Sequence, residues 1–192
     1  METRSQASIK FKSGISEFEQ CDVKDETSGM LDTNFVGEEI FLIEPKEKPV
    51  RAIDVAVYIL NSLGSCTSMK LHKLLYYCQA WSLVWDEAPL FDDRIEAWAN
   101  GPVVKDVFSY HRGVFIVDAD VFPNGNIDRL SSIQIDTIDS VLKFYGDKSA
   151  QWLINLTHSE DPWRNARKGL DSMERGNREI TPASMAEYYS SL

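Results

Sequence analysis

The sequence predicts a mainly α-helical domain of the α+β class, compact and built around one buried central helix, with a small β-hairpin or short sheet. The first observation is that apolar residues recur every three to four positions in most segments after residue 49, which is the period of an amphipathic helix. The second is the stretch from Met69 to Trp81, MKLHKLLYYCQAW, where Leu71 and Leu74 keep that period while Tyr77 adds apolar surface on another side. A helix that is apolar on most sides is a buried one, so we place this helix at the centre.

The first helix of the domain is expected over residues 50–63. Pro49 suits a helix start, and Gly64 suits a helix end. The central helix follows after a short turn, with Thr67 or Ser68 offering a side-chain oxygen to its first free amides. The two helices should therefore be antiparallel neighbours in the fold.

The segments after the central helix mix short strands with further helices. Residues 95–99 alternate like a strand, and Asn100-Gly101-Pro102 has turn chemistry. A second short apolar run at 114–117 is also compatible with a strand. The periodicity predicts the remaining helices at residues 103–112, 130–145, 149–156, 163–170 and 182–190.

The first 49 residues differ from the rest of the chain, and we divide the sequence into an acidic leader or partner-binding arm, 1–49, and a domain, 50–192. The leader holds six Lys and Arg against eleven Asp and Glu, and it has no Trp. Such a composition is typical of an extended or weakly ordered segment. One apolar run, EIFLIE at residues 39–44, is compatible with a strand or with a segment that docks on a partner.

Composition and charge narrow the function classes. The net charge of −10 disfavours non-specific nucleic-acid binding, because a phosphate backbone repels an acidic surface. Three cysteines without a CxxC pair fit free thiols in a reducing compartment. Neither a signal peptide nor a run of about 18 apolar residues is visible, so we expect a cytoplasmic protein that does not span a membrane.

The residue patterns contain no recognisable catalytic or metal motif. His72, His111 and His158 form no HExxH, HxH or HxxxH pair, and no glycine-rich loop could cradle a phosphate. His158 with Glu160 and Asp161 could imitate an acid/base cluster, yet no Ser or Cys lies in a GxSxG elbow. We expect no metal and no cofactor, and we interpret His158 as a hydrogen-bonded structural residue.

Three motifs carry a resemblance to a known family. They are MKLHKLLYYCQAW, then APLFDDRIEAWANGPVVKDVF at residues 88–108, and LTHSEDPWRNAR at residues 156–167. In order and spacing they resemble the Panacea domain of SocA-like antitoxins, also met in phage-associated proteins, over about residues 50–189. His72 departs from the family pattern, because a glutamine-like residue is expected there. Within these motifs we assign structural roles to Lys70, Leu74, Tyr76, Gln79, Trp81, Gly101, Pro102, His158, Glu160, Pro162, Trp163 and Arg167.

The resemblance implies the antitoxin of a type II toxin–antitoxin system, with phage defence as its setting and no enzymatic activity. Such an antitoxin neutralises a cognate protein toxin, encoded next to it, by direct binding. Aromatic and arginine side chains concentrate at protein interfaces. On that basis the expected toxin contacts are Ile40, Phe41, Leu42 and Ile43 in the leader, and Tyr77, Trp98, Tyr110, His111 and Arg112 in the domain.

Alternatives stay open at this point. A proteolytic adaptor that delivers the toxin to a protease needs two partner surfaces, and a second copy of the chain is a further partner to consider. A hydrolase using His158 and Glu160 is a less favoured reading. A transcription factor is the least favoured, since no basic recognition helix stands out.

Overall fold

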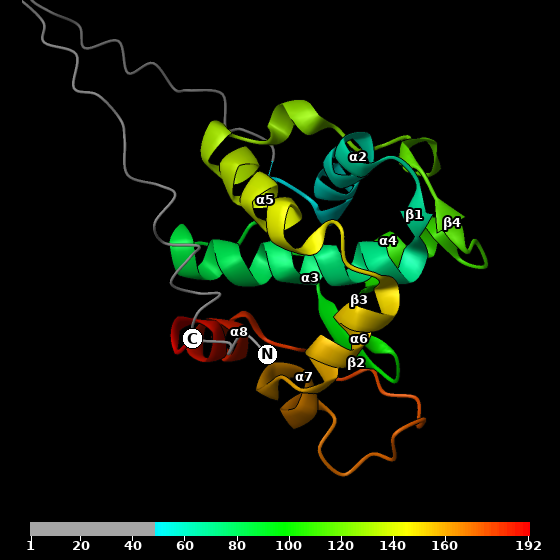
Figure 1. The fold of residues 1–192 in the computed structure, drawn as a ribbon, viewed down its shortest axis with the longest axis vertical. Coiled ribbons are helices and arrows are strands. Elements are labelled where there is room, and N and C mark those ends of the chain that lie inside the picture. The colour runs from blue at the N-terminus through cyan, green and yellow to red at the C-terminus, as the bar shows by residue number, and fades with distance from the viewer. Residues whose placement is uncertain (1–48) are drawn as a thin grey trace, which may run out of the picture. The chain divides into compact units, whose positions relative to one another are not determined.

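The computed structural model describes residues 49–192, and the expected leader contacts Ile40 to Ile43 lie outside these residues. Helix α3, Ser68–Trp85, crosses the middle of the domain, with helices packed on both sides of it (Figure 1). Every residue from Leu71 to Ser82 is buried. The prediction of a buried central helix in a mainly α-helical fold is therefore confirmed.

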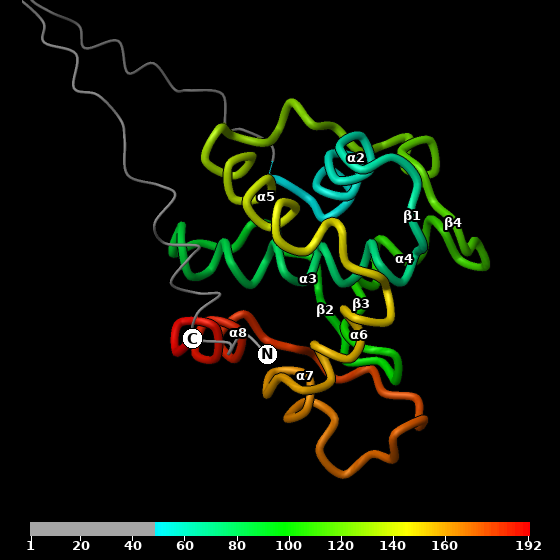
Figure 2. The backbone as a smooth tube through the Cα atoms, in the orientation of Figure 1, coloured from blue at the N-terminus to red at the C-terminus, as the bar shows by residue number. Residues whose placement is uncertain are grey.

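Helices α2 and α5 cover one side of α3 (Figure 2). Helix α2 spans Ala52–Leu63 and ends where Gly64 takes a φ of 75°, which only glycine adopts without strain. Helix α5 spans Ser132–Tyr145, and the Ser131 side chain accepts a hydrogen bond from the Gln134 amide at its start. The apolar faces of both helices bury Ile59 and Ile138 against the core.

Helices α6, α7 and α8 lie on the other side of α3 (Figure 1). They span Ala150–His158, Asp161–Ala166 and Pro182–Ser190. Helix α8 begins as the sequence predicts, because the Thr181 hydroxyl accepts from the Ser184 amide and Pro182 occupies the first helical position. A long loop, residues 167–181, joins α7 to α8 and runs past the strands (Figure 2).

Two small antiparallel sheets complete the described part of the chain. Strands β2, Ile95–Trp98, and β3, Gly101–Val104, form a hairpin in which Trp98 faces Gly101 and Ile95 faces Val104. Strands β1, Cys66–Thr67, and β4, Ile116–Val117, form the second sheet.

Residues 103 and 104 belong to strand β3, and the prediction of a helix over 103–112 was wrong at its start. Gly101 turns the chain back with a φ of 100°, so the next residues pair with β2 instead of winding into a helix. Helix α4 begins only at Lys105 and ends at His111. Two single 3-10 turns, Ala119–Val121 and Ile127–Arg129, then lead to α5.

The buried Asp54 of α2 fixes the segment between β4 and α5. Its carboxylate accepts from the Asn126 amide at 2.7 Å and pairs with Arg129 at 3.2 Å, and it also accepts from the amide of Arg51. A buried carboxylate needs such partners, because an unpaired one would pay a large desolvation cost.

Among the described helices, none combines the length and the apolar character needed to cross a membrane.

Candidate functional site

A cleft of about 800 Å³ opens beside the β2–β3 hairpin. Three elements and one loop contribute its walls: the start of α3, the hairpin, helix α4 and the loop that precedes α8. Its apolar lining is Met69, Trp98, Ala99, Val103, Phe108 and Met173, and its polar lining includes His72, Glu96, Asn100, His111, Arg112, Arg175 and Asn177. Cavities that hold small ligands have this size and this mixture of apolar walls with few polar groups.

Two histidine rings meet in this cleft. The Nε2 atoms of His72 and His111 lie 2.8 Å apart, and both residues are buried. The Val104 amide donates to Nδ1 of His72 at 3.2 Å, so that nitrogen carries no proton. The hydrogen-bond pattern therefore assigns the proton to Nε2 of His72, which donates to Nε2 of His111.

Both rings are held in their neutral forms. Burial lowers the pKa of His72 well below its usual range, and the charges of Lys73 and His111 lower it further. Burial also lowers the pKa of His111. A proton added to Nε2 of His111 would place two donors against each other, so the paired arrangement requires neutral imidazoles.

Lys73 of α3 holds the turn of the β2–β3 hairpin through one hydrogen bond. Its side chain is fully buried, and Nζ donates to the carbonyl oxygen of Pro102 at 2.9 Å. Burial lowers the pKa of Lys73 to about 7. A Cβ on Gly101 would collide with Cε of Lys73, so this glycine is required both by its positive φ and by the close approach of the lysine.

Glu96 lines the cleft from β2 and is almost fully buried. It accepts a hydrogen bond from Nε1 of Trp98 at 2.8 Å. Arg94 and Lys105 lie 3.9 and 3.8 Å from its carboxylate. The indole of Trp98 is thereby held in position, and the negative charge of Glu96 is balanced by neighbouring cations.

Arg167 holds the loop wall of the cleft. Its guanidinium donates to the carbonyl oxygen of Ala97 at 3.1 Å and to those of Asp171 and Glu174 at 2.8 Å each. Gly176 packs so closely on Arg167 that a Cβ there would lie 2.8 Å from Nη1. This single buried arginine therefore ties strand β2 to the loop that carries Met173 and Arg175.

Trp163 closes the same wall from α7. Its Nε1 donates to the carbonyl oxygen of Trp98 at 3.0 Å, and the guanidinium of Arg167 lies 5.4 Å from its ring centre. Residues from all three sequence motifs thus build or support one cleft.

In a comparison with protein families, residues 71–164 match the family described as "Antitoxin SocA-like, Panacea domain". Residues 71–164 form a SocA-like Panacea domain. Searches of curated proteins and of solved structures returned no significant match. The family supports an antitoxin-type role and implies a protein partner such as a toxin.

The matched part of the Panacea domain contains most of the cleft but not its loop wall. His72, Trp98, Phe108 and His111 fall inside residues 71–164, whereas Arg167 and the loop that it holds lie after them. The prediction from the three motifs is confirmed at the level of the family.

Several motif residues of the Panacea domain act within its core. Gln79 accepts from the amides of Leu90 and Phe91 and donates to the Phe91 carbonyl, fixing the loop after α3. Lys70 donates to the carbonyl of Gly146 at 2.6 Å, and Trp81 donates to the hydroxyl of Tyr145. Other motif residues that are fully or almost fully buried include Leu74, Tyr76, Pro102 and Pro162.

Tyr77 belongs to this core and not to an exposed contact surface. It is fully buried, stacks on Tyr145 at 4.2 Å between ring centres and donates to Glu160 at 3.2 Å. Tyr189 donates to the same carboxylate at 2.7 Å. Burial raises the pKa of both tyrosines well above the usual range, and the nearby Glu160 charge contributes. The aromatic cluster therefore encloses Glu160 between neutral phenols.

His158 is held by stacking. Its ring lies 3.9 Å from the Trp163 ring centre at an interplanar angle of 12°, and its Nε2 has no hydrogen-bond partner among the described residues. Burial lowers its pKa, as do the charges of Lys73 and Arg167. The hydrogen-bonded role expected for His158 is not what the structure shows at Nε2.

The described residues also contain no group of three or more His, Cys, Asp or Glu that could hold a metal ion.

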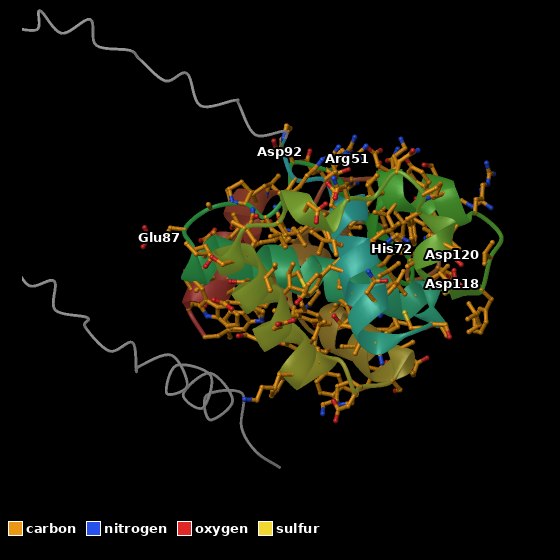
Figure 3. The ribbon with its side chains drawn as sticks, turned by 90° about the horizontal axis from the view of Figure 1, so that it is seen from above. Arg51, His72, Glu87, Asp92, Asp118 and Asp120 are labelled. Carbon is orange, nitrogen blue, oxygen red and sulfur yellow. The ribbon has the colours of Figure 1, made fainter. Side chains whose placement is uncertain are left out.

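A ridge of exposed apolar residues lies just outside the cleft. We define it as Val114, Phe115 and Ile116, which are 43, 70 and 51 % exposed, together with the half-exposed Tyr110. The ridge follows Arg112 at the mouth of the cleft, and the exposed Asp118 and Asp120 come after it at the edge of the domain, while His72 lies inside (Figure 3).

The structure separates the sequence-predicted contacts of the domain into three places. Trp98, His111 and Arg112 line the cleft, Tyr110 lies on the ridge, and Tyr77 lies in the core. Sequence reasoning missed the cleft residues Phe108, Met173 and Arg175. Phe108 had a signal, since it lies one helical turn before His111, but the loop residues had none.

Proposed function

We propose that this chain is the antitoxin of a two-gene, type II toxin–antitoxin system and neutralises its toxin by binding it directly. The proposal combines the Panacea family match with one observation, the exposed ridge. Contiguous exposed apolar side chains on a compact domain mark interaction sites.

The ridge suits a protein partner. Phe115 exposes most of its ring, and Val114 and Ile116 flank it along the chain. Tyr110 and Arg112 add the side-chain types that dominate binding energy at interfaces. The backbone beneath the ridge is held in place, because the Phe115 carbonyl accepts from the Ser68 amide at 2.9 Å and Ile116 pairs with Thr67.

The leader is a second contact in this proposal, with Ile40 to Ile43 as its apolar anchor. An acidic arm that orders on a partner can wrap a large surface. Deleting residues 1–49 should then weaken protection against the toxin while leaving the domain folded. Full protection by the deletion variant would remove the arm from the proposal.

The test of the ridge is growth rescue. The neighbouring gene is expressed from an inducible promoter with the wild-type chain, with Phe115→Ser/Ile116→Ser, or with Ile133→Ser as a matched control. Ile133 is 63 % exposed on α5, so its loss removes a similar apolar surface elsewhere. The wild type and the control should rescue growth, and the ridge variant should fail while keeping its thermal stability.

The same experiment separates direct inhibition from delivery to a protease. Toxin abundance is measured by immunoblot in each rescued culture. A toxin that stays abundant but inactive supports inhibition by binding, whereas a toxin that disappears supports the adaptor mechanism. Rescue by the ridge variant at the wild-type level would contradict the proposed contact.

A further inference from the structure

The cleft behind the ridge has the properties of a separate ligand site. Its volume of about 800 Å³ is within the range of pockets that enclose small organic molecules. The ridge residues Phe115 and Ile116 do not line it, although the toxin surface proposed above shares Arg112 with the cleft. Ligand binding in the cleft is therefore separate from the proposed toxin contact through Phe115 and Ile116.

Aromatic rings form the inner wall. Trp98 and Phe108 meet edge to face at 4.8 Å between ring centres, and Phe108 meets His111 in the same manner at 5.4 Å. Because these rings contact one another, a ligand must pack against the cluster instead of entering between its members. Such a wall favours a flat apolar group, which can stack or meet a ring edge.

The charges at the cleft favour an anion. The carboxylate of Glu96 is engaged by Nε1 of Trp98, and Arg94 and Lys105 lie within 4 Å of it. Two further guanidinium groups, those of Arg112 and Arg175, line the cleft with exposed side chains and have no hydrogen bond or ion pair with any described residue. Arginine suits carboxylate and phosphate groups, which it can bind through two parallel hydrogen bonds.

The walls of the cleft are preformed, because hydrogen bonds within the protein hold them. Arg167 ties the loop that carries Arg175 to strand β2, and the Lys73–Pro102 hydrogen bond fixes the hairpin that carries Trp98. A preformed site loses little entropy on binding and therefore retains more of its contact energy as affinity.

We propose that this cleft binds a small aromatic anion, with its ring against Trp98 and Phe108 and its acidic group between Arg112 and Arg175. The carboxylate and the phosphate are both suited to the two arginines, and the experiment distinguishes them. The occupant is a small molecule, because the cleft encloses a volume of ligand size.

The experiment is isothermal titration calorimetry on the full-length chain with three probes: indole-3-acetate, phenyl phosphate and the uncharged indole-3-acetamide. At least one anion should bind, and the amide should bind the chain about tenfold more weakly than indole-3-acetate or not at all, because it lacks a charge-assisted hydrogen bond. The tighter of the two anions identifies the acidic group.

Charge-reversal variants locate the site. Arg112→Glu and Arg175→Glu should each weaken the binding of whichever anion binds the wild type more tightly, by about tenfold or more. Lys143→Glu, an exposed lysine on α5, is the matched control and should bind as the wild type does. Phe108→Leu should weaken the binding of both anions, because it removes an aromatic ring from the wall of the cleft. A thermal unfolding curve checks that this variant folds.

Three results would overturn the proposal. Failure of both anions to bind at up to roughly 10 mM would exclude the site, because that concentration is high enough to detect very weak complexes. Equal affinity for indole-3-acetate and its amide would remove the anion requirement. Wild-type affinity in both arginine variants would place the bound probe elsewhere.

Discussion

Nε2 of His72 and Nε2 of His111 share one proton across 2.8 Å, and this contact joins the central helix to helix α4 in the cleft. His72 lies at a position where the Panacea pattern led us to expect a glutamine-like residue. Both rings titrate below the usual range of histidine because they are buried. The pair therefore makes the cleft sensitive to acid.

The first prediction concerns that sensitivity. A histidine whose pKa is lower in the folded chain than in the unfolded chain contributes stability above pH 6.5, and this contribution is lost as the pH falls through the folded-state pKa. Each unit by which the pKa is lowered corresponds to about 1.4 kcal/mol. Thermal unfolding measured from pH 7.5 to pH 5 should show a steeper loss of stability for the wild type than for His72→Gln/His111→Gln.

Other titrating groups near the pair are the same in both proteins, so the difference between the two curves isolates the histidines. Lys73 lies beside His72 on α3, and Glu96 faces the cleft from β2. Lys105 is the first residue of α4, and Arg112 directly follows its end. Parallel curves for the two proteins would contradict the assignment of the neutral pair.

Lys73 gives the second prediction. Its pKa of about 7 lies far below the value of 10.5 for a free lysine, so the unfolded chain binds the proton more tightly. The burial penalty is complete below pH 7, shrinks as the pH rises, and vanishes above 10.5. Lys73→Met should therefore gain stability relative to the wild type at pH 6, by an amount reduced by the lost hydrogen bond to Pro102.

The advantage of Lys73→Met should then decline as denaturant unfolding is repeated up to pH 9. The expected change across that range is on the order of 2 kcal/mol, since the folded wild type sheds its buried charge. An advantage that stays constant or grows with pH would show that Lys73 is not held with a lowered pKa.

Gly101 gives the third prediction. Gly101→Ala would combine a positive φ with a collision against Lys73, and it should cost about 3 kcal/mol or more of unfolding free energy. Gly113→Ala is the control, because Gly113 has a φ of 85° with no atom within 4 Å of the added Cβ, and it should cost about 1 kcal/mol. Equal costs in urea unfolding would mean that the contact with Lys73 does not constrain the turn.

Arg167 gives the fourth prediction. Arg167→Lys keeps the charge but cannot donate to Ala97 and to the loop carbonyls at once. Hydrogen exchange of residues 170–177 should accelerate at least tenfold, which corresponds to a loss of about 1.4 kcal/mol of local stability. Lys168→Met, at an exposed neighbour, should leave that exchange unchanged. Unchanged exchange in Arg167→Lys would assign the order of the loop to other contacts.

The sequence was informative where structure depends on local pattern. Helix α3 could be predicted because its apolar side chains extend around the helix, and α8 because Thr181 and Pro182 form a local start signal. Strand β3 could not, since residues 101–104 take strand form only through pairing with β2 after the turn at Gly101.

The same distinction applies to the cleft. Trp98, His111 and Arg112 could be suspected because they lie near one turn in the sequence. Arg175 could not, because its loop is positioned by contacts between residues far apart in the sequence, among them the hydrogen bond from Arg167 to Ala97, 70 positions away. The apolar run at 114–117 is compatible with a strand in the sequence, and only the fold shows that most of it is exposed.

The proposed toxin contact is best tested by hydrogen exchange of the chain alone and after co-purification with the product of the neighbouring gene. We predict that the two proteins elute as one complex and that residues 110–117, which hold the ridge, gain protection in it. Separate elution of the two proteins, or a complex in which residues 110–117 exchange as fast as in the free chain, would mean that the ridge does not bind the toxin.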